Sequence, residues 1–405
     1  MPAVEIVAAE SGRAHRQFID LPYRLYRNDP RFVAPLRRER RELFSRTRHP
    51  FFAHADAAFF VARRAGRVVG RIEAIVNHAH GAQHDGRIGF FGAYECAPDR
   101  AASDALLDAA AAWLRARGKT VMRGPYTHSQ NEEYALLVDG FDAPPVVQLT
   151  YNPPYYADLL EGYGLRPARD LHAWWADTDR EPAPRLLRIA AAIHARGHIT
   201  VRSLRLADYD AEVDRAELLL NEVLAQTRGF VPVTSAELRF AARQFRSLFR
   251  PELVLFAEVD GIPAGILLAM PDFNQALARV PDGRLFPFGW LRIARGLKQI
   301  NQLRLLALGV RPAYRRRGIE LLLCLELREA ARRLGYRGGE LSMVWEDNEA
   351  IHHTIAAMGG RRTKTYRIYE APIPSPREAP VPSPREAPVP SPREAGRGLG
   401  RGVCP

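Results

Sequence analysis

Runs of apolar residues alternate with short polar breaks along the chain, and the length of each run separates strands from helices. The run QLRLLALGV at Gln302–Val310 is apolar and too short for a typical helix, so it predicts a buried strand. The break RPAYRRRG follows, with consecutive arginines and Gly318, and then an apolar, helix-forming segment that ends near Gly335. The pattern therefore predicts a strand, a basic glycine turn and a helix in direct succession.

The apolar pattern of the first half of the chain recurs in the second half. ARRAGRVVGRIEAIV begins at Ala62 and AEVDGIPAGILLAMP at Ala257, and each predicts two strands joined by a tight glycine turn. NPPYYADLLEGYG at Asn152–Gly164 matches NEAIHHTIAAMGG at Asn348–Gly360, and each predicts a short helix closed by glycine before another strand. We interpret the two halves as tandem copies of one α/β unit.

The expected domains are residues 1–178, residues 199–370 and a tail over residues 371–405. The octapeptide PSPREAPV recurs in the tail. Prolines with scattered arginines and glutamates cannot build a core, so we expect this segment to be disordered.

Each copy contains a segment that has no counterpart in the other copy. The first copy contains GPYTHSQNEEYALLVDGFDAPP, which is polar and turn-rich and is therefore a candidate pocket lining. The second contains Leu285–Ile300, whose helical pattern separates apolar from basic positions. The apolar positions are Trp290, Ile293, Leu297 and Ile300, and the basic positions are Arg292, Arg295 and Lys298. Two interpretations stay open: a lid helix that packs on its domain, and an interfacial helix that makes peripheral membrane contact.

Composition and charge limit the classes of binding partner that we expect. The net charge of +12 favours anionic ligands such as a phosphorylated cofactor or acidic lipid. Motifs of the common nucleic-acid-binding folds are missing from the sequence, so no nucleic-acid partner is expected. The N-terminal MPAVEIVAAES lacks signal-peptide features and no apolar run approaches a membrane span. We expect a cytoplasmic protein, associated with the inner membrane face if the interfacial interpretation holds.

The histidine run NHAHGAQHD is the strongest pattern for a metal site. It holds His78, His80 and His84, but no cysteine or second cluster lies near it in the sequence. We interpret it as a loop rich in histidine and expect no metal.

The basic glycine turn points to a specific anion. A helix start has unpaired N–H groups and the positive end of the dipole, so Arg315–Arg317 would oppose the dipole unless an anion binds there. Gly318 lets the backbone approach that anion, and the arrangement suits a pyrophosphate. A solvated basic turn is the alternative interpretation. In the first copy Asp99 and Asp104 occupy the corresponding positions, so only the second copy is expected to bind an anion.

These residues resemble the GNAT N-acyltransferases. The segment Arg315-Arg316-Arg317-Gly318-Ile319-Glu320 matches the family's coenzyme A motif at its first Arg and its Gly, whereas Glu320 replaces a small residue. Asn348 and Gly359 match the later pattern, but Ile355 stands where many relatives carry a proton-donating Tyr. With FIDLPYRLYRNDPRFVAPL near the start and KTYRIYE near the end, the chain is similar to bacterial tandem acetyltransferase-like proteins, including ceramide synthases.

The resemblance implies two tandem GNAT-like domains, the first degenerate, each a mixed, mainly antiparallel sheet flanked by helices. It implies acetyl-CoA or a longer acyl-CoA as co-substrate and a primary amine, such as a sphingoid base, as acceptor. The residues expected to bind the co-substrate are Leu308, Gly309, Val310, Arg315, Arg316, Arg317, Gly318, Ile319 and Asn348.

Transfer to an amine also needs proton-transfer groups. Candidates for the base follow the strand ELSMVW, namely Glu346, Asp347 and His352, and Tyr366 is a candidate for the missing acid. The carboxylates could instead cap the next helix, and Tyr366 could belong to the core. The sequence therefore favours an acyl-CoA-dependent N-acyltransferase, and a non-catalytic acyl-CoA-binding or lipid-binding protein remains the alternative.

Overall fold

The hairpins and short helices predicted from the internal repeat are present in both halves. The computed structural model describes residues 2–225, 227, 229–245 and 248–374. The first half contains β1 (Val4–Ala8), α1 (Gly12–Leu25), α2 (Arg37–Leu43), η1 (Pro50–Ala53), β2 (Ala55–Arg64), β3 (Arg67–Asn77), α3 (His78–Gln83), β4 (Ile88–Cys96), α4 (Arg100–Arg115), β5 (Val121–Gly124), β6 (Leu136–Asp139), α5 (Tyr155–Tyr163) and β7 (Arg166–Asp177).

The second half repeats this order after a connecting helix. It contains α6 (Pro184–His194), β8 (Ile199–Ser203), η2 (Leu206–Asp208), α7 (Tyr209–Leu224), α8 (Ser235–Phe245), η3 (Pro251–Leu253), β9 (Val254–Val259), β10 (Ile262–Pro271), α9 (Asn274–Leu277), α10 (Gly289–Leu297), β11 (Gln302–Val310), η4 (Pro312–Tyr314), α11 (Ile319–Arg333), β12 (Gly338–Trp345), α12 (Glu349–Ala357) and β13 (Arg361–Pro372). The predicted strand Gln302–Val310 is confirmed as β11. Gly164 and Gly359 follow α5 and α12 with positive φ, as the glycine-closed helices require.

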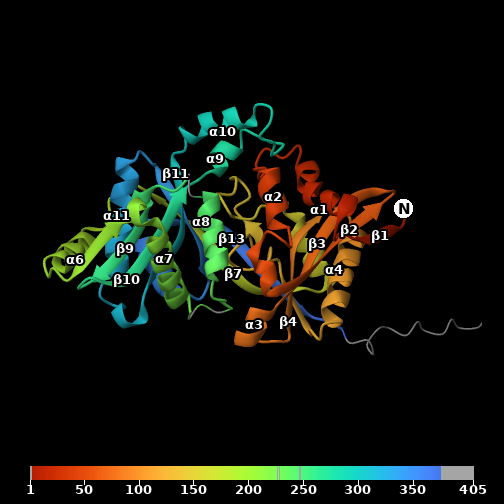
Figure 1. Cartoon of the computed structure of the whole chain (residues 1–405), viewed down its shortest axis with the longest axis horizontal. Coiled ribbons are helices and arrows are strands. Elements are labelled where there is room, and N and C mark those ends of the chain that lie inside the picture. Colours follow the sequence, from red (N-terminus) through yellow and green to blue (C-terminus); the bar gives the residue numbers. More distant parts are fainter. Residues whose placement is uncertain (1, 226, 228, 246–247, 375–405) are drawn as a thin grey trace, which may run out of the picture. The chain divides into compact units, whose positions relative to one another are not determined.

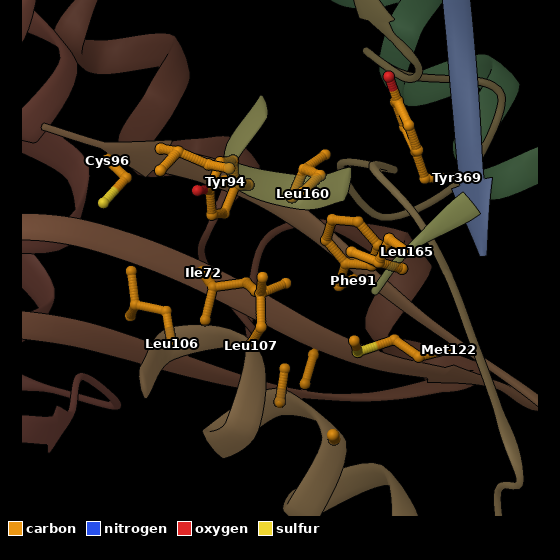
Figure 2. Packing of buried hydrophobic residues seen from close by; sticks show 14 of the residues in the cluster. Ile72, Phe91, Tyr94, Cys96, Leu106, Leu107, Met122, Leu160, Leu165 and Tyr369 are labelled. Carbon is orange, nitrogen blue, oxygen red and sulfur yellow. The ribbon is translucent and has the colours of Figure 1, made fainter. Parts of the chain in front are cut away.

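One sheet runs through both halves (Figure 1). Among the described residues its thirteen strands follow the order β1-β2-β3-β4-β5-β13-β7-β12-β11-β10-β9-β8, with β6 also pairing with β13. The last strands of the halves are exchanged: β13 lies between β5 and β7, while β7 pairs with β12. Tyr369 of β13 packs in the first half's core with Phe91 and Met122 (Figure 2). Each half is thus completed by a strand of the other, and residues up to Ile373 form one compact unit.

The final strand continues past the expected boundary at residue 371. Ala371 pairs with Met122 and Pro372 with Val121. Ile373 is buried, and its backbone N–H donates to the carbonyl of Thr120. Residues 371–373 therefore belong to the folded unit, and the prediction of a disordered tail now concerns residues 375–405, which lie outside the described residues.

Helices cover both faces of the sheet in each half. In the first half, α4 and α5 pack on one face and α1 on the other. In the second half the side chains of β9 alternate, so that Leu255 and Ala257 face α11 whereas Val254 and Phe256 face α7. This layering leaves the C-terminal end of β11 between α7 and α11, where the candidate site lies.

The segment between β10 and β11 joins the second half to the first. The Oδ1 atom of Asp272 accepts the backbone N–H of Val147 at 2.8 Å, and Asn274 Nδ2 donates to the carbonyl of Pro145 at 2.9 Å. Further along, the N–H of Arg37 donates to the carbonyl of Gly283 at 3.0 Å. The insertion in the second copy therefore has a structural role at the junction of the halves.

The buried carboxyl at this junction makes stability depend on pH. Burial raises the pKa of Asp272 to about 7, so the folded protein favours its protonated form. The contribution of the Asp272 carboxyl group to the free energy of unfolding is fully present below about pH 4 and is lost as the pH rises through about 7. We expect Asp272→Asn, which keeps the Oδ1 acceptor, to match the wild type near pH 4 and to be more stable above pH 7 by about 1–3 kcal/mol.

Thermal unfolding between pH 4 and pH 8 tests this expectation. Asp282→Asn, at an exposed carboxylate of the same segment, is the matched control for the substitution itself. A difference between Asp272→Asn and wild type that is constant across this range would contradict the assignment.

Candidate functional site

The parallel strands β11 and β12 separate along their length. Their pairing covers Gln302–Leu305 with Gly338–Leu341 and stops there. Leu306 is an extra residue of β11 opposite β10, and such a bulge bends the strand. Beyond the bulge the strands line a cavity of about 1290 Å³. Leu308, Gly309 and Val310 are among its lining residues, and their backbone on the β12 side has no ladder partner in the described strand pairs.

The start of α11 forms one end of this cavity. The first helical bond joins the N–H of Leu322 to the carbonyl of Gly318, so the preceding N–H groups of α11 have no partner within the helix. Arg316 and Gly318 have φ of 61° and 78°, a left-handed backbone that presents successive N–H groups to one side. Gly318 and Arg315 line the cavity. The N–H groups at this helix start therefore have the arrangement that the sequence predicts for anion binding, and the binding itself stays a prediction.

The other residues of this turn that were predicted to bind the co-substrate have less direct access to the cavity. Arg317 stacks over the Tyr314 ring at 5.2 Å, and neither Arg316 nor Arg317 lines the cavity. The Ile319 side chain is buried in the core, which leaves its backbone N–H as the group that faces an anion. Arg315 Nε donates to the carbonyl of Val310 at 3.2 Å, which folds its side chain back onto the end of β11.

The predicted proton-transfer residues are not gathered at one point. Trp174 Nε1 donates to Nδ1 of His352 at 3.1 Å, and Nε2 of His352 donates to the carbonyl of Trp345 at 3.0 Å. Both ring nitrogens of His352 are thus engaged. Glu346 and Asp347 lie 3.5 and 3.9 Å from Arg169, and of these two carboxylates Asp347 lines the cavity.

Of the other two predicted residues, Asn348 lines the cavity and Tyr366 does not. Tyr366 is fully buried outside the cavity lining, and burial raises the pKa of its hydroxyl well above the usual range. Asn348 lines the cavity and also caps α12, accepting the N–H of Ile351 at 3.4 Å. Ile355 lines the cavity too, so the wall is apolar where many relatives of the resembled family carry a tyrosine.

The first half contributes a polar wall to the cavity. Ser129, Gln130, Asn131, Glu132 and Tyr134 line it, which confirms the predicted pocket-lining role of the turn-rich insertion. Glu132 Oε1 lies 3.4 Å from Nε2 of His49, a second lining residue. The N–H of Phe51 donates to Nδ1 of His49, which assigns the proton of the neutral ring to Nε2, an atom that makes no hydrogen bond within the described residues.

Sequence reasoning missed the pair of His49 and Glu132. The available signal was the insertion itself, which marked the neighbourhood of Glu132. Nothing in the local sequence marked His49, because the loop before η1 meets the insertion only after the half has folded.

In the first half, the crevice between β4 and β5 that corresponds to the gap between β11 and β12 is closed. β4 and β5 also pair over three residues and then separate. The N–H of Tyr126 then donates to the carbonyl of Phe91 at 2.7 Å, and a side chain at Gly92 would overlap the Tyr126 carbonyl. At the start of α4, Asp99 accepts the N–H of Ala102 at 3.1 Å. The first copy therefore has neither the open crevice nor the free helix start.

Three further observations concern the residues that the structure describes. Among the described residues, no group of three His, Cys, Asp or Glu side chains is arranged to hold a metal ion. A search of the same residues for a helix with the length and apolar character needed to cross a bilayer finds none. Burial raises the pKa of the Cys324 thiol in the cavity wall to about 12, so this cysteine is a neutral wall residue.

The separated parallel strands, the bulge and the basic helix start define a tandem GNAT-type fold. A tandem GNAT protein from the clavulanic acid biosynthesis pathway shares it with a TM-score of 0.53 and 16% identity, over 92% of this chain and 99% of that one. A glucosamine N-acetyltransferase region of a fungal multi-domain β-N-acetylglucosaminidase gives a TM-score of 0.55 and 13% identity, over 92% of this chain and 38% of that one.

Sequence comparison gives the family. The chain is 35% identical to the bacterial ceramide synthase of Caulobacter vibrioides, over 91% of this chain and 97% of that protein. It is 32% identical to protein YghO of Escherichia coli, over 88% and 93% of the two chains. No family model matches the sequence. The chain belongs to the family of tandem GNAT-type proteins that contains these two relatives.

Proposed function

We propose that this protein transfers an acyl group from acyl-CoA to a lipidic primary amine such as a sphingoid base. The observation that carries the proposal is one cavity lined both by the start of α11, whose first N–H groups have no partner within the helix, and by a group of apolar side chains. The pyrophosphate would bind the N–H groups that begin α11, and the pantetheine arm would follow the unpaired edge of β11. The name of the Caulobacter relative, a ceramide synthase, supports the same substrate class.

The apolar chamber supports a long aliphatic substrate. It lies against α7, α8 and the face of β11 that they cover, and its wall includes Leu204, Val213, Ala216, Leu220, Leu224, Phe230, Val233, Leu238, Phe249 and Leu268. The cavity of about 1290 Å³ exceeds the roughly 300–1,000 Å³ typical of a site for one small ligand. There is room for an acyl chain together with an alkyl amine.

The reaction requires an uncharged amine. Alkyl ammonium groups have a pKa near ~10, so a base must take the proton before the nitrogen attacks the thioester carbon. We assign this role to Glu132, with His49 as the positioning residue behind it. As the C–N bond forms and the C–S bond breaks, those N–H groups of Leu308–Val310 that face away from β10 would stabilise the charge on the carbonyl oxygen. The proton from the amine balances the one needed by the leaving thiolate, and the products are an amide and coenzyme A.

A substitution in the chamber tests the substrate class. We expect Ala216→Trp to lower activity with a long-chain acyl-CoA at least tenfold while activity with acetyl-CoA stays within about threefold, because the indole fills the apolar end and leaves the helix start open. Coenzyme A release is measured with a panel of amines. Leu218→Trp, at an exposed position of the same helix, is the matched control.

Two outcomes would contradict the proposal. Equal losses with both acyl-CoA lengths in Ala216→Trp would show that the chamber does not hold the acyl chain. Tight coenzyme A binding by the wild type without turnover on any lipid amine would favour the non-catalytic alternative.

A further inference from the structure

The segment around α10 exposes a group of large apolar side chains. Phe286 is 78% exposed, Phe288 66%, Trp290 52% and Leu297 37%. A single exposed apolar residue needs no explanation, but four within one short segment form a patch of the kind that marks an interaction surface.

Close packing on the inner side fixes this outward orientation. Gly296 is buried against Ala276 of α9, and Gly289 is buried beside Arg284. Because glycines occupy the inner face of α10, the large side chains of its neighbours point away from the domain. Of the predicted apolar face, Ile293 is half-buried and Ile300 packs against the core, as a lid helix requires, whereas Trp290 and Leu297 are exposed. Figure 1 shows α10 with α9 at an edge of the molecule.

The charge around the patch is strongly positive. Residues 279–300 contain five basic side chains and one carboxylate, Asp282, which gives a net charge of +4. The basic residues are Arg279, Arg284, Arg292, Arg295 and Lys298, and all of them are exposed. None forms an ion pair with a carboxylate in the part of the chain that the structure describes. Within the described residues, no ion pair therefore neutralises the positive charge of this segment.

We propose that the surface formed by Phe286–Lys298 docks onto an anionic lipid membrane. Exposed Trp and Phe side chains favour the boundary between headgroups and acyl chains, and the surrounding arginines and lysine favour anionic headgroups. A helix that exposes aromatic and basic side chains together has the composition of an interfacial helix. The proposal rests on the proposed function in one respect: a lipidic amine is concentrated in membranes, so docking brings the protein to its acceptor.

Vesicle sedimentation with the full chain tests the docking. Vesicles of phosphatidylcholine with phosphatidylglycerol are compared with pure phosphatidylcholine, both without substrate. We expect the wild type to partition onto the anionic vesicles. The triple variant Phe286→Ser, Phe288→Ser, Trp290→Ser should lose at least tenfold in partition coefficient. Substituting Arg292, Arg295 and Lys298 by Gln should lose a similar amount on anionic vesicles.

The control carries the same kind of change elsewhere. Leu206→Ser with Ile262→Ser alters two exposed apolar residues away from α10 and should bind like the wild type. A wild type that does not sediment with either vesicle, or an aromatic variant that binds as well as the wild type, would overturn the proposal. Turnover of a short acyl-CoA with a water-soluble amine, measured without vesicles, reports separately on the proposed function and should be unchanged in the aromatic variant.

Discussion

Gly318→Glu is expected to lower the affinity for coenzyme A by at least about 100-fold, which corresponds to about 3 kcal/mol. Gly318 has a φ of 78°, a conformation that costs a residue with a Cβ about 1–2 kcal/mol. A side chain here would also overlap Ile193 of the connecting helix α6. The carboxylate would stand at the positive end of α11, where the pyrophosphate is expected, so that charge repulsion adds to the steric effect.

Calorimetric titration with coenzyme A measures this effect, and two further variants separate its causes. Gly318→Ala carries the steric change without the charge and should lose less affinity than Gly318→Glu. Asp99→Ala removes the cap of α4 in the first copy, where it also pairs with Arg64 at 2.6 Å. That variant should be less stable by about 1 kcal/mol but should bind coenzyme A normally. Unchanged affinity in Gly318→Glu would end the assignment of the pyrophosphate site to α11.

Glu132→Gln is expected to lower kcat by about 10²–10⁴-fold, since the amide cannot accept the proton of the ammonium. The isosteric change keeps the neighbouring His49 in place, so the KM for acyl-CoA should change little. Because the loss comes from proton transfer, the residual rate should rise with pH as more of the amine is deprotonated in solution. Steady-state kinetics across pH provide both readings.

Glu346→Gln provides the direct comparison. Glu346 is one of the candidates for the base that the sequence offers, whereas the structure gives it Arg169 as a neighbour and leaves it outside the cavity lining. If Glu346→Gln loses the rate and Glu132→Gln does not, the base lies on the second half, as the sequence suggests. His49→Gln should give a smaller loss than Glu132→Gln, because a positioning residue acts through its neighbour.

Local patterns along the chain determined much of the fold. The apolar run of β11, the glycine-turn hairpins and the glycine-closed helices α5 and α12 all agree with the sequence prediction, because contiguous residues encode each of them. The internal repeat predicted the same elements in both halves. The loss of the basic turn at Asp99 also agrees with the closed crevice of the first half, since a carboxylate that caps a helix occupies the position an anion would need.

The tertiary structure alone decided how those elements combine. The exchange of β7 and β13 depends on which strand edges meet after folding, and no residue within either strand specifies its distant partner. The same long-range packing fills the first crevice with Tyr126, engages both nitrogens of His352 and buries Tyr366. It also brings Glu132 and His49 from the first half to a cavity whose helix start belongs to the second. The type of each element follows from local propensity and periodicity, whereas the composition of the cavity follows from contacts between residues far apart in the sequence.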